Sequence, residues 1–298
     1  MKKNKTFQRM YNQRALYALL LLPVIYYIIF CYVPMYGLNI AFRKNIITYD
    51  WIGFANFKKF LTDPYFIKTL LKNTLILNFY NIVFAFPAPI ILALMFNELH
   101  NAKFKRIIQS ITYLPHFIST VVICGMVVTF LSNDGFINQI IASLGGTRIQ
   151  FLMKAELFRP IYIISGIWQN IGWSSIIYLA AISGVDEEMY EAATIDGAGR
   201  FRKMLSITLP SIMPTISIML IMAIGGMMTS ATEKILLLYN GATYQTADVI
   251  STYVYRRGMQ SADYGYASAV GMFQSVIGLV MLFYANKISG KVSENSLW

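Results

Sequence analysis

Residues 191–210 read EAATIDGAGRFRKMLSITLP, a charged segment that joins two long apolar runs. Its residues follow a regular spacing: three residues separate Ala193 from Gly197, nine separate Gly197 from Ile207, and Leu209-Pro210 closes the pattern. A lone Glu-Ala-Ala triplet is ordinary in a good helix former, whereas the whole spaced pattern between two apolar runs is specific. The stretch therefore predicts a structured loop between two membrane-spanning helices.

The composition is that of a membrane protein. Of the 298 residues, 56% are hydrophobic and 13% are charged, whereas soluble domains carry about 25% charged residues. Uncharged windows longer than the ~20 residues that a helix needs to cross the hydrocarbon core are Ala15–Phe42, Asn73–Asn97, Ile107–Asn133, Pro160–Val185, Met204–Thr232 and Tyr264–Asn286. These windows do not alternate as barrel strands do, and helices satisfy their own backbone groups in lipid. We therefore expect an all-α integral membrane protein with six transmembrane helices, near residues 16–36, 72–96, 108–131, 160–183, 211–231 and 265–286.

The clusters of basic residues predict the orientation. Lys and Arg divide almost evenly between the two sides, so their total does not decide it. The basic start of the chain, Lys103-Lys105-Arg106 and Arg200-Arg202-Lys203 fall on the inner side if the N-terminus is inside, as the positive-inside rule prefers. An even number of spans then places both termini in the cytoplasm. The first apolar run exceeds the about 7–15 residues of a signal-peptide core, so we expect an uncleaved helix. The net charge of +11 is attributed to this topology and to anionic lipid, rather than to nucleic acid.

The loop at 184–210 is expected to form two short helices. Its acidic start favours a helix N-terminus, so residues 187–195 are predicted to be helical. Gly197 and Gly199 interrupt this helix, because glycine adopts backbone angles that other residues avoid. Residues 200–208 are predicted to form the second helix. The first helix presents a small, mildly apolar face that suits a groove on another protein.

Two absences in the sequence indicate that energy comes from a partner. The chain has no Gly-x-x-x-x-Gly-Lys-Ser/Thr phosphate loop, so it does not bind ATP in that manner. It also has no ionisable residue deep in a predicted span, where ion-coupled carriers place them. Cys31, Cys124, His100 and His116 are isolated, so neither a disulfide framework nor a metal site is predicted. The sequence also shows no convergent set of Ser, His and Asp that would indicate an enzyme.

The spaced pattern resembles the EAA motif of ABC importer permeases, the loop through which such a permease contacts its ATPase. Gly53, Asn56 and Phe57 look like the G-x-x-N-F segment of sugar importers, and residues 235–273 are similar to permeases of bacterial complex-carbohydrate importers of the LplB type, related to the maltose-type permeases. By this resemblance, Glu191 pairs with a basic residue of the ATPase. The residues that the resemblance assigns to ATPase coupling are Glu188, Glu191, Ala192, Ala193, Asp196, Gly197, Ala198, Arg200, Ile207, Leu209 and Pro210.

The resemblance implies a type I ABC importer permease fold and a multi-pass protein of the bacterial cell membrane. Its implied parts are a cytoplasmic N-terminus (1–15), the first helix (16–36), an outer loop (37–70), a permease core of five helices (71–286) that includes the coupling loop, and a cytoplasmic tail (287–298). The implied partners are a second, non-identical permease, two copies of an ABC ATPase, an extracytoplasmic binding lipoprotein and lipid. ATP and Mg would be used by the ATPase, and this chain would bind no cofactor.

Polar and aromatic residues within or at the ends of the predicted spans are candidates for a sugar path, because sugars offer hydroxyls to amides and flat faces to aromatic rings. Gln169 and Trp173 lie four apart, on one helix face. The candidate path residues are Asn78, Asn81, Trp168, Gln169, Asn170, Trp173, Glu233 and Gln274. Hydrogen bonding between helices is the alternative for the amides. Glu233 and Lys234, at the end of the fifth span, are predicted to form an interface ion pair, and a position of Glu233 on the translocation path is the alternative.

Three other functions stay open at this point. The same ABC role with peptide, amino-acid or glycerol-phosphate cargo fits the loop equally well, because the loop contacts the ATPase and not the cargo. A stand-alone secondary carrier or channel is disfavoured by the lack of intramembrane carboxylates. A membrane-embedded enzyme lacks a catalytic set.

Overall fold

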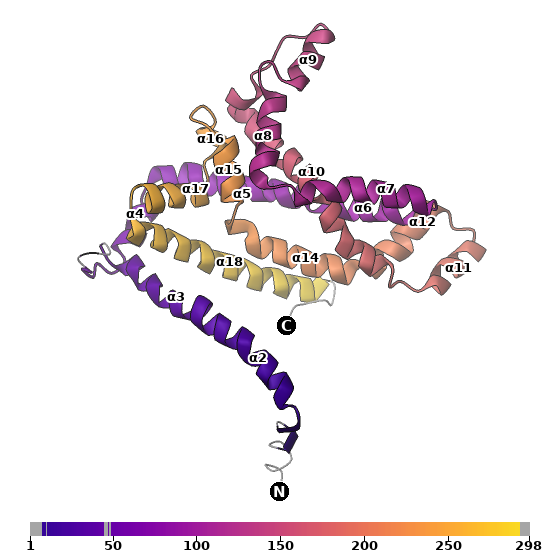
Figure 1. The fold of residues 1–298 in the computed structure, drawn as a ribbon, viewed down its shortest axis with the longest axis horizontal. Helices are drawn as coiled ribbons and strands as arrows, with labels where there is room; N and C mark the ends of the chain where they lie inside the picture. Colours follow the sequence, from indigo (N-terminus) through magenta and orange to yellow (C-terminus); the bar gives the residue numbers. More distant parts are fainter. Residues whose placement is uncertain (1–7, 10, 45–46, 48, 293–298) are drawn as a thin grey trace.

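The computed structural model describes residues 8–9, 11–44, 47 and 49–292, and over these residues the chain is helical. They contain no β-strand, only an isolated antiparallel bridge between Arg43 and Trp51. Most of the long helices run side by side along one direction (Figure 1). The predicted all-α class is confirmed.

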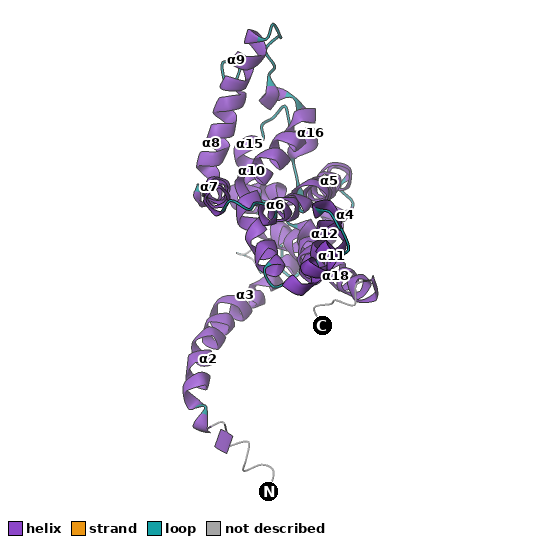
Figure 2. Cartoon of the chain, turned by 90° about the vertical axis from the view of Figure 1, so that its right-hand side faces the viewer, coloured by secondary structure: helices purple, strands orange, loops and turns teal. Residues whose placement is uncertain are grey.

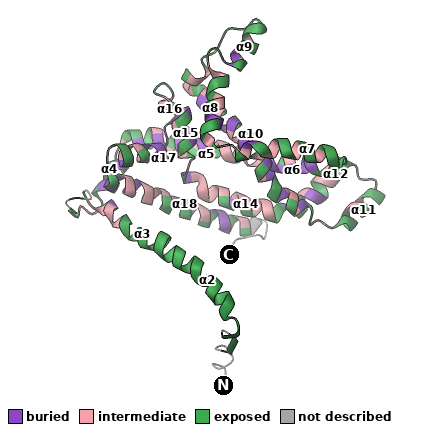
Figure 3. Cartoon of the chain, in the orientation of Figure 1, coloured by how far each residue is buried: buried purple, intermediate pink, exposed green. Residues whose placement is uncertain are grey.

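The N-terminal helical stretch stands apart from the rest (Figure 1). It runs from Arg14 to Phe42 and contains the predicted first span. None of the residues from Arg14 to Met35 is buried, and Figure 3 shows this stretch exposed along its length. Its parts are α2 (Arg14–Tyr27), the π-helix η1 (Ile28–Tyr32), α3 (Val33–Met35) and the 3-10 helix η2 (Tyr36–Phe42).

The second span forms one continuous helical stretch from Phe66 to Glu98, as predicted. It follows α4 (Ala55–Leu61), which Asn56 fixes by donating from Nδ2 to the carbonyl oxygens of Ala41 and Arg43 at 2.9 and 3.0 Å. The parts of this span are η3 (Phe66–Leu71), α5 (Lys72–Tyr80), η4 (Asn81–Ala85) and α6 (Pro87–Asn97).

The predicted third span, 108–131, is wrong as a single helix. Its first half belongs to α7 (Ala102–Tyr113) and its second to α8 (Thr120–Leu131), with the 3-10 turn η5 (Leu114–Phe117) between them. Proline lacks a backbone N–H and disfavours helix in the residue before it, so Pro115 ends α7, and Ser119 caps the new helix. Helix α7 packs against α10 (Ala155–Ile182), whereas α8 turns away from the bundle (Figures 1 and 2). Then follow α9 (Phe136–Ser143) and η6 (Phe151–Met153).

Helix α10 (Ala155–Ile182) contains the predicted fourth span, and its 28 residues make it about 42 Å long. The loop segment follows, and its helices are α11 (Glu187–Ile195), α12 (Arg200–Lys203), η7 (Met204–Thr208) and α13 (Leu209–Ser211). The predicted fifth span is shorter than expected and comprises α14 (Met213–Gly225) and η8 (Gly226–Met228). The last part contains α15 (Thr232–Leu238), α16 (Tyr244–Ala247), α17 (Ile250–Tyr255), η9 (Arg256–Gln260) and α18 (Tyr264–Val292), which extends beyond the predicted sixth span.

Four helical stretches among the described residues are long and apolar enough to cross a membrane: Arg14–Phe42, Phe66–Glu98, Thr120–Ser143 and Tyr264–Gly290. A fifth results if Arg200–Ser211 and Met213–Met228, bent by 61°, form one span. Helix α10 is long enough but carries amide and indole side chains. The number of six spans therefore stays a prediction.

Three hydrophobic clusters follow one another along the bundle. The first surrounds Phe66 and Tyr266, where the second span begins. The second surrounds Leu77 in the second span and Tyr162 in the first third of α10. The third surrounds Ile90, where α6 packs against the end of α10. The packed core therefore extends along the whole length of the bundle.

Candidate functional site

Helix α11 ends in a turn that explains the spacing of the EAATIDGA pattern. Gly197 has φ +75°, in the left-handed region that favours glycine. Its N–H donates to the carbonyl oxygen of Thr194 at 3.0 Å, and the Ala198 N–H donates to that of Ala193 at 2.9 Å. This pair of bonds defines the Schellman motif that closes a helix. The three residues between Ala193 and Gly197 are thus the last turn of α11, and the predicted bounds of 187–195 are confirmed.

Helix α11 has no buried residue and lies at one extreme end of the molecule (Figures 1 and 3). Ile195 is 87% exposed and Phe201, at the start of α12, is 79% exposed. Glu191 is exposed and makes no hydrogen bond or ion pair with the described residues. Apolar and acidic side chains are therefore available to a partner on this surface.

The rest of the loop is fixed to the bundle. The hydroxyl groups of Tyr190 and Thr208 lie 2.9 Å apart, and Lys203 Nζ donates to Thr194 Oγ1 at 2.5 Å. Ile207 is buried in this segment. Of the predicted coupling residues, Glu188, Glu191, Ala192, Asp196, Gly197, Arg200 and Pro210 are exposed, Ala193, Ala198 and Leu209 are half-buried, and Ile207 is buried. The structure thus gathers these residues in one anchored, outward-facing segment.

A cavity of about 520 Å³ lies beneath this segment. It is lined from α11 by Glu187 and Glu191, from α12 by Arg200, and by Glu98 and His100 from the loop after α6. The two loops that the sequence assigns to the inner side therefore meet at one end of the bundle.

A second cavity, of about 620 Å³, lies about halfway along the bundle and is called the central cavity below. Its lining includes Asn81, near the middle of the Phe66–Glu98 stretch, and Gln169 and Asn170, near the middle of α10. Three of the predicted path residues thus come together. Transport proteins commonly bind cargo near the bilayer midplane, at the interface of helical repeats.

His116 joins this cavity although the sequence shows it as isolated. Its ring stacks on that of Trp173 at 4.7 Å between centroids, and Nδ1 lies 3.1 Å from Asn170 Oδ1. Gln169 Nε2 is directed to the Ile118 carbonyl oxygen at 3.4 Å. The break between α7 and α8 therefore brings side chains to the cavity that a continuous third span would place elsewhere.

The other predicted path residues lie outside the central cavity. Asn78 donates to Ser230 Oγ at 3.0 Å, and Gln274 donates to the Met228 carbonyl oxygen at 2.7 Å, which are bonds between segments of the bundle. Trp168 lines a separate apolar cavity of about 420 Å³. Trp173 contacts the cavity through His116, and Glu233 is exposed.

The predicted ion pair between Glu233 and Lys234 is wrong. The two side chains do not pair: Lys234 is 5% exposed and lines the central cavity, whereas Glu233 is exposed. The reason is the rotational setting of α15, which buries Lys234, Ile235 and Leu238 on one face. In the sequence, this buried face is indicated by Lys234 and Leu238, which lie four residues apart and therefore on one side of a helix.

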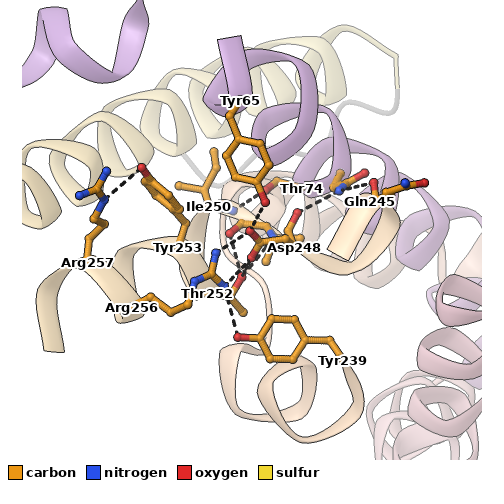
Figure 4. A network of polar contacts seen from close by, with 12 residues as sticks. Tyr65, Thr74, Tyr239, Gln245, Asp248, Ile250, Thr252, Tyr253, Arg256 and Arg257 are labelled. Atoms are coloured by element: carbon orange, nitrogen blue, oxygen red, sulfur yellow. Dashed lines mark hydrogen bonds and ion pairs between the residues drawn. The ribbon is translucent and has the colours of Figure 1, made fainter. Parts of the chain in front are cut away.

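A buried polar network fixes the segment between the fifth and last spans, and sequence patterns do not predict it (Figure 4). Asp248 is fully buried and accepts two bonds from Arg256, at 2.8 and 2.6 Å. Tyr65 and Thr252 donate to the same carboxylate at 2.6 and 2.7 Å. Asn73 donates to the Asp248 carbonyl oxygen at 2.9 Å. Burial and the bond to Asp248 raise the pKa of Tyr65, and that carboxylate raises the pKa of Arg256. The network joins segments far apart in sequence.

Within the described residues, no three His, Cys, Asp or Glu side chains form a group that could hold a metal ion. The two cysteines are free, Cys31 exposed and Cys124 buried. The geometry therefore offers an exposed loop and a polar cavity.

Comparison with known proteins matches both the fold and the sequence. Residues 85–294 match the family of binding-protein-dependent transport system inner membrane components. The chain is 41% identical, over 100% of its length and 94% of the relative's, to the polygalacturonan/rhamnogalacturonan transport system permease YteP of Bacillus subtilis. It is 44% identical, over 95% of its length and 91% of the relative's, to LplB of the same organism. It also resembles a chain in the crystal structure of a bacterial alginate ABC transporter in complex with a pentasaccharide-bound periplasmic protein, with 43% identity, a TM-score of 0.91, and coverage of 98% and 99%.

Proposed function

This chain belongs to the family of binding-protein-dependent transport system inner membrane components, and from that premise we propose which cargo it carries and how it is driven. It is an ABC transporter permease, an integral membrane protein with the type I permease fold, and a transport subunit rather than an enzyme. The proposed function is import of an oligosaccharide, driven by an ATPase that docks on α11 and α12.

The observation that carries the coupling proposal is the state of α11. It is a helix of nine residues with none buried, yet a Schellman turn and the bonds of Tyr190 and Lys203 hold it in one orientation. A surface helix that none of the described residues covers, with exposed Ile195 at its end and exposed Phe201 at the start of α12, suits the groove of a partner. Closing of the ATPase dimer would move this segment, and the bundle with it.

The cargo proposal rests on relatives and on the central cavity. The named relatives include a permease for polygalacturonan and rhamnogalacturonan and one in an alginate transporter. The cavity offers the side-chain amides of Asn81 and Asn170 and the hydroxyls of Ser174 and Thr120. Such groups suit the hydroxyls of a sugar.

We infer the partners of this chain from the same relatives. The alginate transporter was solved with a sugar-loaded periplasmic protein, which supports an extracytoplasmic binding lipoprotein for this chain. The exposed apolar helix α2 suits lipid and a second, non-identical permease. Two ATPase subunits would bind ATP and Mg below the 187–210 loops.

ATP-driven uptake of radiolabelled oligosaccharide into membrane vesicles tests this function. Replacing the exposed carboxylate in Glu191→Ala should reduce uptake to near background while the protein stays in the membrane. The matched control is Glu156→Ala, an exposed glutamate at the other end of α10, which should transport normally. Normal uptake by Glu191→Ala would contradict coupling through α11, and no uptake of any oligosaccharide by the wild-type complex would contradict the cargo proposal.

A further inference from the structure

The central cavity holds a charged side chain that has no counter-ion among the residues that the structure describes. Lys234 is 5% exposed, and its Nζ donates to the Tyr162 carbonyl oxygen at 3.0 Å. The same nitrogen lies 4.9 Å from the centroid of the Tyr162 ring. None of the ion pairs among the described residues includes Lys234. An ammonium group has three donors, so its contacts with the described residues leave donors unused.

The rest of the cavity lining does not neutralise this charge. Among the described residues that line it, none is acidic, and the polar ones such as Asn81, Asn170 and Ser174 carry no charge. A buried ammonium ion without a paired charge is costly. Ionisable residues at membrane depth are rare and mark the pathway of a substrate or ion.

The packing of α10 leaves room for this ammonium group. A Cβ atom added at Gly166 would lie 3.1 Å from Lys234 Nζ, closer than an ordinary contact. Gly166 and Asn170 lie four apart, on one face of α10, and both line the cavity. The nitrogen therefore lies against bare backbone, beside an amide that reaches the same space.

We propose that Lys234 binds a carboxylate of the cargo, so that this permease selects acidic oligosaccharides built from uronate units. The inference rests on the proposed oligosaccharide function and adds the chemical class of the sugar. A carboxylate would supply the missing negative charge and accept the unused donors of the ammonium group. A single positive charge among neutral amides matches the charge of one carboxylate, whereas a phosphate monoester carries about −1.5 to −2 charges at pH 7. The amides nearby would then bind the sugar hydroxyls.

The test compares an acidic sugar with its neutral counterpart on the assembled complex. The complex with its second permease and ATPase is placed in nanodiscs, and binding is measured by saturation-transfer NMR. The probes are trigalacturonate and the same trisaccharide with its carboxyl groups reduced to alcohols. The wild-type complex should bind trigalacturonate about tenfold or more tightly than the reduced sugar, the lower end of what a hydrogen bond to a charged group contributes.

Three variants separate charge from packing. Lys234→Gln keeps an N–H donor for the Tyr162 carbonyl oxygen but removes the charge, so it should lose about tenfold in affinity for trigalacturonate and bind the reduced sugar as before. Lys234→Arg keeps the positive charge, so it should still bind trigalacturonate more tightly than the reduced sugar. Glu233→Gln, at the exposed neighbour, should change neither affinity.

Two results would overturn the inference while leaving the oligosaccharide function intact. One is equal affinity of the wild-type complex for both sugars, which decides the matter even if Lys234→Gln does not assemble. The other is an equal loss of affinity for both sugars in an assembled Lys234→Gln complex, which would show that Lys234 has a packing role. Binding of neither sugar by a wild-type complex that imports some other class of cargo would reject both proposals.

Discussion

Replacing Gly197 by alanine isolates the backbone conformation of the coupling loop. A Cβ atom at this position would have no heavy atom within 4 Å, so the substitution introduces no clash. The cost comes from φ +75° alone, and a left-handed conformation costs an L-residue about 1–2 kcal/mol. The chain can avoid this strain only by giving up the turn and its two hydrogen bonds, each of which contributes about 0.5–1.5 kcal/mol. The two costs are similar, so the variant should populate other loop conformations.

The expected effect is a weaker contact with the ATPase. The strain of about 1–2 kcal/mol lowers the ratio of the docking-competent conformation to the alternatives by about 5- to 30-fold. Because leaving the turn costs a similar amount, the two populations become comparable, and the apparent Kd rises by about twofold or more. The assay titrates the purified ATPase subunit onto permease complexes in nanodiscs and measures the Kd.

Two controls make this test specific. Gly199→Ala also has open space around its Cβ but has φ −70°, so its Kd should match that of wild type. Gly197→Asn should lie between the two, because asparagine tolerates the left-handed region better than alanine. If Gly197→Ala binds the ATPase as tightly as Gly199→Ala, the turn does not position α11 for docking.

Two further predictions concern the stability of the bundle, measured by thermal unfolding in detergent. A Cβ atom at Gly172 would lie 2.1 Å from the Thr112 carbonyl oxygen, so Gly172→Ala should destabilise the contact of α7 with α10 by about 1–3 kcal/mol. Gly271→Ala, which has open space in α18, should be neutral or stabilising. If the two variants change the unfolding temperature equally, α7 and α10 do not approach as closely as described. Asp248→Ala should cost about 3 kcal/mol because it leaves a half-buried arginine without its partner. Asp134→Ala, which removes an exposed ion pair, should cost less than about 1 kcal/mol, and a loss as small for Asp248→Ala would contradict a stabilising role of the network.

Local sequence determines the coupling loop, and this is why it could be predicted. The bounds of α11 and the left-handed Gly197 follow from an acidic helix start, a glycine stop and residues within one turn of each other. The helical conformation of α10 likewise follows from a long uncharged run. Both features depend on neighbours in the chain.

The break between α7 and α8 and the role of Lys234 depend on more than local composition. Residues 107–133 are uncharged throughout, so charge alone does not show that Pro115 divides them. The choice between Glu233 and Lys234 depends on the rotation of α15, a helix of only seven residues packed against distant segments. The Asp248 network joins positions up to 183 residues apart, and no short-range pattern reports such a contact.

The most direct measurement of the central claim is a crosslink from α11. A photoreactive amino acid at Ile195, which is 87% exposed, is irradiated in native membranes, and the adduct is identified by mass spectrometry. We expect an adduct with a protein that carries the Gly-x-x-x-x-Gly-Lys-Ser/Thr phosphate loop. We expect none with that protein from a probe at Leu19 in α2, a 69% exposed control. The claim would be contradicted by an Ile195 probe that yields no adduct with such an ATPase, or by one that crosslinks to it no better than the Leu19 probe.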